Sequence, residues 1–398
     1  MDLIAPTSAE HFDPLVDLFA RTFSPYWTQV GYAREGYIGH SPYDWEASRI
    51  GVVDGEIATH FGVWDYRMRI GGSLVRLAAI GAVATHEPHR KKGLMDRTAR
   101  DCVDAMSEAG YDMSLLFGIP GFYQRFGYVC AFSQIRTTLK TKEVKALDRA
   151  VPYEAVEGPA GDLVSGELAK LSNRDNEGVT GTFLRPTYRT NRMPEKFTVY
   201  RFAGGYVVGG ADGSTWQVAD CAGDPETVVE VARLRATAEV CPEIDFVFLP
   251  PRSRLGEHLQ TLTHRRIANR HAEGGPMMKI VNLRRAFEKI APELGRRLGA
   301  SPLRSYRGRL AVEGDAQRIV LGIDDGRVEV AADAGDGARM RPDGTVAAGA
   351  GLARLVIGDG DPMRVCRQSG IGLSGDARDL LPVLFPDQEP STILWDRF

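Results

Sequence analysis

The 398-residue sequence lacks the features that mark membrane, secreted or nucleic-acid-binding proteins. No apolar run approaches the ~20 residues that a transmembrane helix needs. The first fifteen residues, MDLIAPTSAEHFDPL, have neither the basic start nor the long apolar stretch of a signal peptide. A net charge of −3 gives no global attraction to nucleic acid or anionic lipid. We therefore expect neither a membrane nor a nucleic acid as partner.

Cysteine and histidine are also scarce. The five cysteines are odd in number and widely spaced, which predicts no disulfide framework and favours a reducing, cytoplasmic location. The eight histidines are scattered, and only His86 and His89 lie close together. We expect both to be solvated loop residues, and we expect no metal site.

The first third of the chain predicts a mixed sheet with docked helices. Apolar residues at helical spacing follow Ser8, and a second helix is expected over 95–109. Asp54-Gly55 and Gly71-Gly72 mark hairpin turns between strands. A short buried strand, MSLLFGI, follows the second helix, and Pro120-Gly121 ends it.

The same order partly repeats from about residue 148, so the sequence indicates α+β tandem mixed-sheet domains. The turn of the second copy, CAGDPE, is acidic and would repel phosphate. From Met277 onward the spacing predicts an amphipathic linker helix with Leu283, Phe287, Ile290 and Leu294 on one face, followed by a third, smaller α+β region. The apolar run at Ile393, Leu394, Trp395 and Phe398 predicts a docked chain end.

The turn RKKGLM, residues 90–95, lies between an apolar strand and an amphipathic helix. A helix N-terminus, backbone N–H groups, a glycine and several cations together suit a pyrophosphate. The spacing differs from the Walker loop and from the dinucleotide fingerprint. The alternative is a solvated basic loop, but its position between strand and helix favours phosphate binding.

The stretch VATHEPHRKKGLMDRTAR resembles the acetyl-CoA motif of the GNAT N-acetyltransferase superfamily. Arg90 begins the matched signature, Gly93 is its first glycine, and Met95 stands where glycine or alanine is usual. With FYQRFGY further on, the chain resembles the Eis-like (enhanced intracellular survival) branch. The resemblance implies acetyl-CoA as cosubstrate, bound by Val83, Ala84, Thr85, Arg90, Lys91, Lys92, Gly93, Leu94 and Met95.

The resemblance also implies a domain plan and an assembly. It implies an acetyl-CoA-binding GNAT domain over 1–147, a second GNAT-like domain without cofactor over 148–285, and a sterol-carrier-protein-like domain over 286–398. Eis-like proteins are hexamers, so a homo-hexamer is the expected assembly.

Acetyl transfer to an amine needs an oxyanion site, an acid and a base. Backbone N–H groups of Val83 and Thr85 are the expected donors to the acetyl carbonyl. The Eis-like match implies that Tyr123 is the general acid and that the C-terminal carboxylate of Phe398 is the base. The alternatives are that Tyr123, like Tyr128, is a core residue and that Phe398 simply packs. Other candidate carboxylates for the base are Glu35, Asp44 and Glu46.

The acceptor is less defined than the cosubstrate. Tyr26, Trp27, Ala82 and Arg397 are the expected substrate contacts, and the aromatic loop around Tyr26 is either a lid or local packing. Aminoglycoside-modifying relatives carry acids where this chain has Arg397 and Pro25, so aminoglycoside acetylation does not follow. A polyamine-like molecule or a lysine is the expected amine. The alternative is a non-catalytic protein that binds acetyl-CoA or a hydrophobic ligand.

Overall fold

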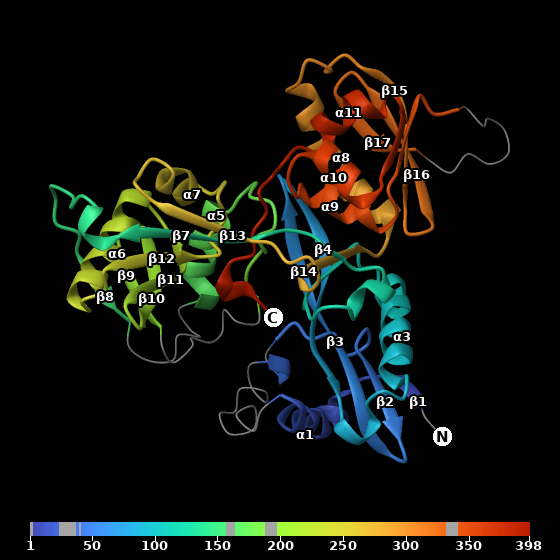
Figure 1. Cartoon of the computed structure of the whole chain (residues 1–398), viewed down its shortest axis with the longest axis horizontal. Helices are drawn as coiled ribbons and strands as arrows, with labels where there is room; N and C mark the ends of the chain where they lie inside the picture. The colour runs from blue at the N-terminus through green and yellow to red at the C-terminus, as the bar shows by residue number, and fades with distance from the viewer. Residues whose placement is uncertain (1–2, 24–36, 40, 157–163, 188–196, 332–340) are drawn as a thin grey trace. The chain divides into compact units, whose positions relative to one another are not determined.

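The computed structural model describes residues 3–23, 37–39, 41–156, 164–187, 197–331 and 341–398 (Figure 1). The chain forms two compact units. The first unit comprises Met1–Phe132 and His271–Gln388, and the second comprises Ser133–Arg270 and Glu389–Phe398. The first unit holds two sheets and the second unit holds one, which confirms the expected α+β class.

The first sheet has the strand order β1-β2-β3-β4-β5-β14-β6. Its strands are β1 Leu3–Pro6, β2 Arg49–Val53, β3 Glu56–Ile70, β4 Ser73–Thr85, β5 Met113–Gly118, β14 Gly275–Ile280 and β6 Val129–Cys130. Both predicted hairpin turns are present, because Gly55 and Gly71 take the left-handed backbone conformation between antiparallel strands. Strands β4 and β5 are parallel, and helix α3 Leu94–Glu108 connects them.

Two helices cover opposite faces of this sheet. Helix α1, Phe12–Thr22, packs its Phe19 ring 5.0 Å from the ring of His60 on β3. The next residue of β3, Phe61, packs instead in a cluster with Ala99 and Cys102 of α3. Neighbouring residues of a strand point to opposite faces, so α1 and α3 lie on different sides of the sheet. Figure 1 shows α3 running alongside β2 and β3. The predicted helix over 95–109 is confirmed within one residue at each end.

The second sheet has the order β13-β7-β12-β11-β10-β9-β8. Its strands are β7 Gln134–Lys140, β8 Tyr153–Ala155, β9 Thr198–Phe202, β10 Gly205–Asp212, β11 Thr215–Ala222, β12 Glu243–Val247 and β13 Arg265–Asn269. Helix α6, Pro225–Ala238, connects the parallel strands β11 and β12, as α3 connects β4 and β5. The shorter helices are α5 Ala169–Asp175 and α7 Arg254–Leu259. The repeated strand–helix–strand order expected from the sequence is present.

Two strands pair with a sheet on the other side of the domain boundaries expected at residues 147 and 285. Strand β7 pairs with β12 and β13 in the second sheet, and β14 pairs with β5 and β6 in the first. The compact units accordingly change between Phe132 and Ser133 and between Arg270 and His271. The division into separate domains over 1–147, 148–285 and 286–398 stays a prediction.

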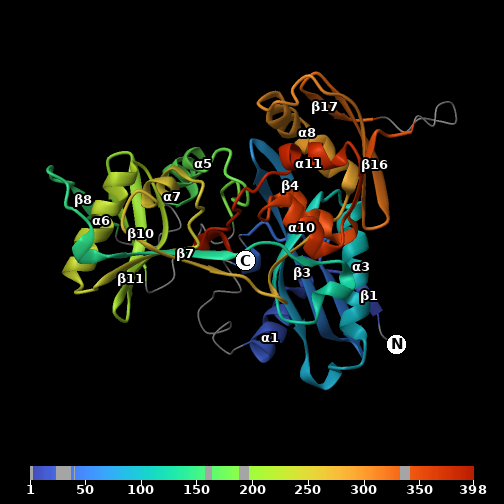
Figure 2. The same cartoon turned by 45° about the horizontal axis from the view of Figure 1, so that its top comes forward.

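The third sheet, in the first unit, has the order β17-β16-β15-β18-β19. Its strands are β15 Arg307–Gly314, β16 Gln317–Asp324, β17 Arg327–Val330, β18 Gly344–Ala347 and β19 Gly372–Gly375. Its helices are α8 Leu283–Gly299, α9 Leu352–Ile357, α10 Pro362–Ser369 and α11 Ala377–Leu384 (Figure 1). Figure 2 shows α8, α10 and α11 from a second direction. The predicted apolar face of α8 is fully buried, although residues 277–280 before it form a strand and not the start of the helix. A sterol-carrier-like character of this region stays a prediction.

In the part of the chain that the structure describes, no helix combines the length and the apolar character needed to cross a bilayer.

Candidate active site

A cavity of about 510 Å³ lies in the first unit, where the end of β4, the basic turn and the start of α3 meet. It is lined by Thr22, Val83, Thr85, His89, Arg90, Lys91, Gly93, Leu94, Met95, Asp96, Ile119, Phe122, Tyr123 and Arg125. The structure therefore brings the predicted general acid to most of the predicted acetyl-CoA residues. Ala82, Ala84 and Lys92 are not among the residues that line it.

The parallel strands β4 and β5 part beside the cavity. Their last paired residues are Ile80 and Leu116, whereas β4 continues to Thr85 and β5 to Gly118. Val83 and Thr85 of the separated segment line the cavity, and Ala84 between them is buried. A strand that has left its neighbour has backbone N–H and C=O groups on that side for another partner. This segment can therefore hold an extended ligand.

The N-terminus of α3 forms one wall of the cavity. Gly93 precedes the helix at φ +76°, makes no side-chain cap bond, and has open space where a Cβ would lie. The N–H groups of the first helical turn have no partner inside the helix, and the helix dipole makes this end partly positive. Arg90, Lys91 and Lys92 are exposed beside it, and the Arg90 Nε donates to the Thr85 carbonyl at 3.3 Å. This donor set fits a pyrophosphate.

Tyr123 also lines the cavity, from a short 3-10 helix spanning Tyr123–Phe126. Its side chain is 8% exposed and packs edge-on against the rings of Phe122 and Tyr128. Burial raises the pKa of Tyr123 to about 12, so the phenol keeps its proton at neutral pH. Within the described residues the hydroxyl makes no hydrogen bond. Its proton is therefore available to a ligand in the cavity.

Two neighbouring residues show how the Tyr123 ring is placed. Gly118 at the end of β5 leaves room for it, because a Cβ there would lie 2.7 Å from Tyr123 Cδ2. Tyr128, by contrast, is a core residue as predicted. It is fully buried, and its hydroxyl lies 2.7 Å from the Ser114 Oγ. Only the first of the two tyrosines reaches the cavity.

Several lining residues were not expected from the sequence. Arg125 lies over the Phe122 ring at 4.6 Å and binds Asp96 at 3.3 Å, so it links the FYQRFGY segment to α3. His89 lines the cavity, although a solvated loop residue was predicted. Both residues lie inside the two motifs quoted from the sequence, and this position could have indicated that they are near the cavity. Thr22 and the exposed Ile119 carry no such signal, because only the fold brings them there.

Ala82 and Asp44, one of the alternative carboxylates, have partners within the fold. Ala82 has φ +44°, and its carbonyl lies 2.8 Å from the Nδ1 of buried His60. Asp44 accepts a hydrogen bond from the Tyr111 hydroxyl at 2.7 Å and bonds from the N–H groups of Glu46 and Ala47. Asp44 is therefore committed to structure. Pro25, Tyr26, Trp27 and Glu35 lie outside the described residues.

The start of α6 in the second unit has different chemistry from the start of α3. The Asp224 carboxylate accepts from the Thr227 N–H at 3.0 Å, and Asp175 accepts from the Gly223 N–H at 2.6 Å. The hydrogen bonds from Thr227 lower the pKa of Asp224. Carboxylates of this chain thus occupy the donors that would face a phosphate. The acidic turn predicted for the second copy is present.

The C-terminal residues pack within the second unit. Ile393 is buried with Tyr206 and Ala222, which confirms the expected docked end. Asp396 accepts hydrogen bonds from both the Nε and the Nη2 of buried Arg185. The ring centroids of Phe398 and Phe183 are 6.2 Å apart, and the Arg397 guanidinium lies 3.7 Å from the centroid of Phe248.

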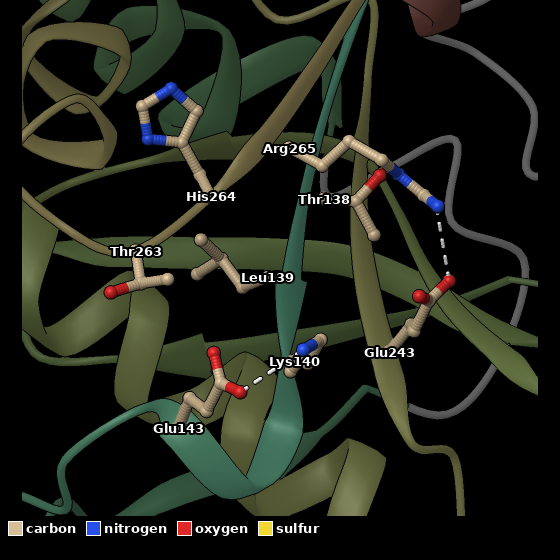
Figure 3. Close-up of a pocket in the computed structure, with 8 residues that line it drawn as sticks. All are labelled: Thr138, Leu139, Lys140, Glu143, Glu243, Thr263, His264 and Arg265. Atoms are coloured by element: carbon tan, nitrogen blue, oxygen red, sulfur yellow. Dashed lines mark hydrogen bonds and ion pairs between the residues drawn. The ribbon is translucent and has the colours of Figure 1, made fainter.

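A second cavity, of about 240 Å³, lies in the second unit between β7, β12 and β13 (Figure 3). Its charged side chains pair with one another: Lys140 with Glu143 at 3.2 Å and Arg265 with Glu243 at 3.3 Å. None of the predicted site residues lines it. The candidate site is therefore the cavity beside β4 and α3.

Comparison with known proteins agrees with this assignment. Residues 4–131 match the model of the acetyltransferase (GNAT) domain family. This part of the chain therefore resembles a GNAT acetyltransferase domain. All the residues that line the cavity beside Tyr123 fall within this matched segment. No curated protein sequence matches the chain.

Solved structures extend the likeness to the whole chain. A GCN5-related N-acetyltransferase from Kribbella flavida is 18% identical with a TM-score of 0.74, over 100% of this chain and 98% of that one. One from Anabaena variabilis is 17% identical with a TM-score of 0.72, over 100% of both chains. Eis1 from Mycobacterium abscessus is 16% identical with a TM-score of 0.68, again over 100% of both. The chain shares their fold, which agrees with an Eis-like plan of tandem GNAT-like domains.

Proposed function

We propose that the protein is an acetyl-CoA-dependent N-acetyltransferase of Eis-like type that transfers the acetyl group directly to an amine. The observation that carries the proposal is the single cavity shared by the basic turn, the start of α3, the separated end of β4 and Tyr123. The first three elements suit a phosphate-bearing thioester, and Tyr123 adds a proton donor. A site that only bound phosphate would not need a buried phenol as a proton donor in the same cavity.

The cosubstrate contacts follow from the walls of the cavity. The cations Arg90, Lys91 and Lys92 and the N–H groups of residues 93–95 would hold the pyrophosphate. The β4 backbone from Val83 to Thr85 would hold the acetyl-pantetheine arm and donate to the acetyl carbonyl. Met95 lies in the first turn of α3, where its backbone still contributes a donor despite the larger side chain.

In the transfer step, the neutral amine nitrogen attacks the thioester carbonyl carbon, and the C–S bond of the resulting tetrahedral intermediate breaks. The α-carboxylate of Phe398 takes the proton that the nitrogen loses. The Tyr123 phenol delivers its proton to the departing sulfur, and solvent then reprotonates it. Because a pKa of about 12 makes the phenol a weak acid, the transfer accompanies C–S cleavage and does not precede it.

The acceptor that we propose is a primary amine on a polyamine-like small molecule or a lysine. Arg397, adjacent to the proposed base, is a cation, so an acceptor with fewer positive charges than an aminoglycoside fits better. We further propose a cytoplasmic homo-hexamer, as the Eis-like resemblance implies. The region over 286–398 would be sterol-carrier-like.

The test is release of free CoA from acetyl-CoA in the presence of a panel of amines that includes spermidine and a lysine peptide. Tyr123→Phe should lower kcat by ~10²-fold or more, because general acid catalysis contributes about that much, with acetyl-CoA affinity nearly unchanged. Tyr128→Phe is the matched control, since it removes a buried hydroxyl outside the cavity. Equal loss of affinity and turnover in Tyr123→Phe would show a structural tyrosine. Tight acetyl-CoA binding without CoA release for any amine would support a non-catalytic binding protein.

A further inference from the structure

Strand β4 contains an irregularity immediately before the segment that lines the cavity. Its antiparallel pairing with β3 is regular up to the Gly62–Gly81 pair and resumes at His60–Ala84. Two residues of β4, Ala82 and Val83, thus stand opposite the single residue Phe61, which is a β-bulge. Ala82 takes φ +44°, a left-handed conformation that is unfavourable for alanine. A contact with a neighbouring group is needed to stabilise Ala82 in this conformation.

His60 is the side chain that holds the bulge. It is fully buried, its Nδ1 lies 2.8 Å from the Ala82 carbonyl oxygen, and its Nε2 lies 2.7 Å from the Tyr43 hydroxyl. A carbonyl oxygen only accepts, so Nδ1 carries the proton, and Nε2 of the neutral ring accepts from Tyr43. Burial lowers the pKa of His60 to about 4, which keeps the ring neutral at physiological pH.

The packing around the ring fixes its position as well as its hydrogen bonds. The Phe19 ring of α1 lies 5.0 Å from the imidazole, and the Tyr43 ring stacks at 6.0 Å. A Cβ at Gly62 would lie 2.5 Å from His60 Cε1, so the glycine leaves the space that the ring fills. The donor therefore reaches the Ala82 carbonyl from a rigid side chain.

The hydrogen bond to Ala82 determines the direction of the next N–H group. The Ala82 carbonyl and the Val83 N–H belong to one planar trans peptide, in which the two groups point in opposite directions. With the carbonyl held toward His60, the Val83 N–H points away from that ring. Val83 itself lines the cavity that also contains Tyr123.

We propose that His60 is a positioning residue for acetyl transfer: by holding the Ala82 carbonyl, it aims the Val83 N–H at the acetyl carbonyl oxygen. The inference rests on the proposed function, because it assigns the Val83 N–H as an oxyanion donor. His60 touches neither substrate. It acts through the peptide that joins Ala82 to Val83.

The experiment compares His60→Leu with His60→Asn. Asparagine can place its Nδ2 donor near the position of the imidazole Nδ1, whereas leucine fills the space without a donor. For each variant we would measure Kd for acetyl-CoA and for CoA by calorimetry, and kcat with an amine that the wild type accepts. CoA lacks the acetyl carbonyl, so it reports the phosphate contacts and the integrity of the fold.

His60→Leu should lower kcat by ~10- to 100-fold, less than or equal to the ~10²–10³-fold loss seen when an oxyanion donor is removed. It should also reduce the preference for acetyl-CoA over CoA, with Kd for CoA unchanged within about 2-fold. His60→Asn should recover most of both losses. A purely structural role predicts equal weakening of both ligands and no rescue by asparagine, and either result overturns the proposal. If the wild type binds both ligands but acetylates no amine, the proposed function fails, while the ratio of the two affinities still decides the role of His60.

Discussion

Arg185 offers the sharpest stability test in the second unit. Its guanidinium is 0% exposed and binds Asp396 at 2.9 and 3.0 Å and Asp220 at 2.7 Å, and both carboxylates are 2% exposed. Burial raises the pKa of Asp220, and the neighbouring Arg185 opposes that rise. Arg185→Met would leave two carboxylates in the core without their cation. Breaking a buried pair in this way costs about 3–5 kcal/mol.

Two measurements read out this loss. Chemical denaturation should show the second unit destabilised by about 3–5 kcal/mol. Carboxypeptidase should also remove Phe398 faster than from the wild type, because Asp396 is the polar anchor of the last residues. Arg201→Met is the matched control, since its partner Glu167 is 69% exposed and such surface pairs contribute about 0–1 kcal/mol.

A double-mutant cycle completes the test of this network. Asp396→Asn combined with Arg185→Met should lower the unfolding free energy by less than the sum of the two single changes, with a coupling of about 1–3 kcal/mol. The neutral asparagine removes one of the two buried charges that Arg185→Met leaves without a cation. Unchanged unfolding and unchanged Phe398 removal in Arg185→Met would refute the assignment of Arg185 as the anchor.

Three further predictions concern the candidate site. Two glycines appended after Phe398 should lower kcat by ~10-fold or more without changing acetyl-CoA affinity, since an amide replaces the proposed base; full turnover would exclude that role. Replacing Arg90 and Lys92 by alanine should raise Kd for CoA by ~10-fold or more but leave pantetheine binding unchanged, whereas equal effects would argue against phosphate contacts. His60 has a pKa of about 4 in the folded protein and 6.5 in the unfolded chain. The contribution of neutral His60 to the unfolding free energy is therefore complete above pH 6.5 and is lost as the pH falls through 4. From pH 7 to pH 4 the wild type should therefore lose about 3 kcal/mol more unfolding free energy than His60→Asn, and parallel losses would contradict the shift.

Local sequence patterns predicted the elements that surround the cavity. The helix over 95–109, the turns at Gly55 and Gly71, and the buried face of α8 all follow from short-range periodicity and from glycine in left-handed turns. The resemblance to the Eis-like branch then assigned both the basic turn and Tyr123 to one site, and the structure places both at one cavity. These features depend on residues a few positions apart, so the sequence alone was informative.

The remaining features depend on contacts between distant residues. His60 meets Ala82 across 22 positions, and Arg185 meets Asp396 across 211. Neither contact leaves a local pattern, because a histidine in a strand or an arginine in a loop has many possible partners. The same reason explains why the sequence pattern placed Met277–Ile280 in a helix: the pairing of this strand with β5 is not encoded in its own residues.

The place of β14 has a consequence for how the protein is made. During synthesis, β1 to β6 leave the ribosome long before Gly275. Until β14 is made, β5 and β6 therefore lack the strand that pairs between them. At translation rates of about 5–20 residues per second, that delay is roughly 7–30 s. Over this interval the edge of β5 is open, and the place of buried Met277 beside Gly118 and Tyr123 is empty. A fragment that ends at residue 147 would keep this edge permanently, so we expect it to aggregate.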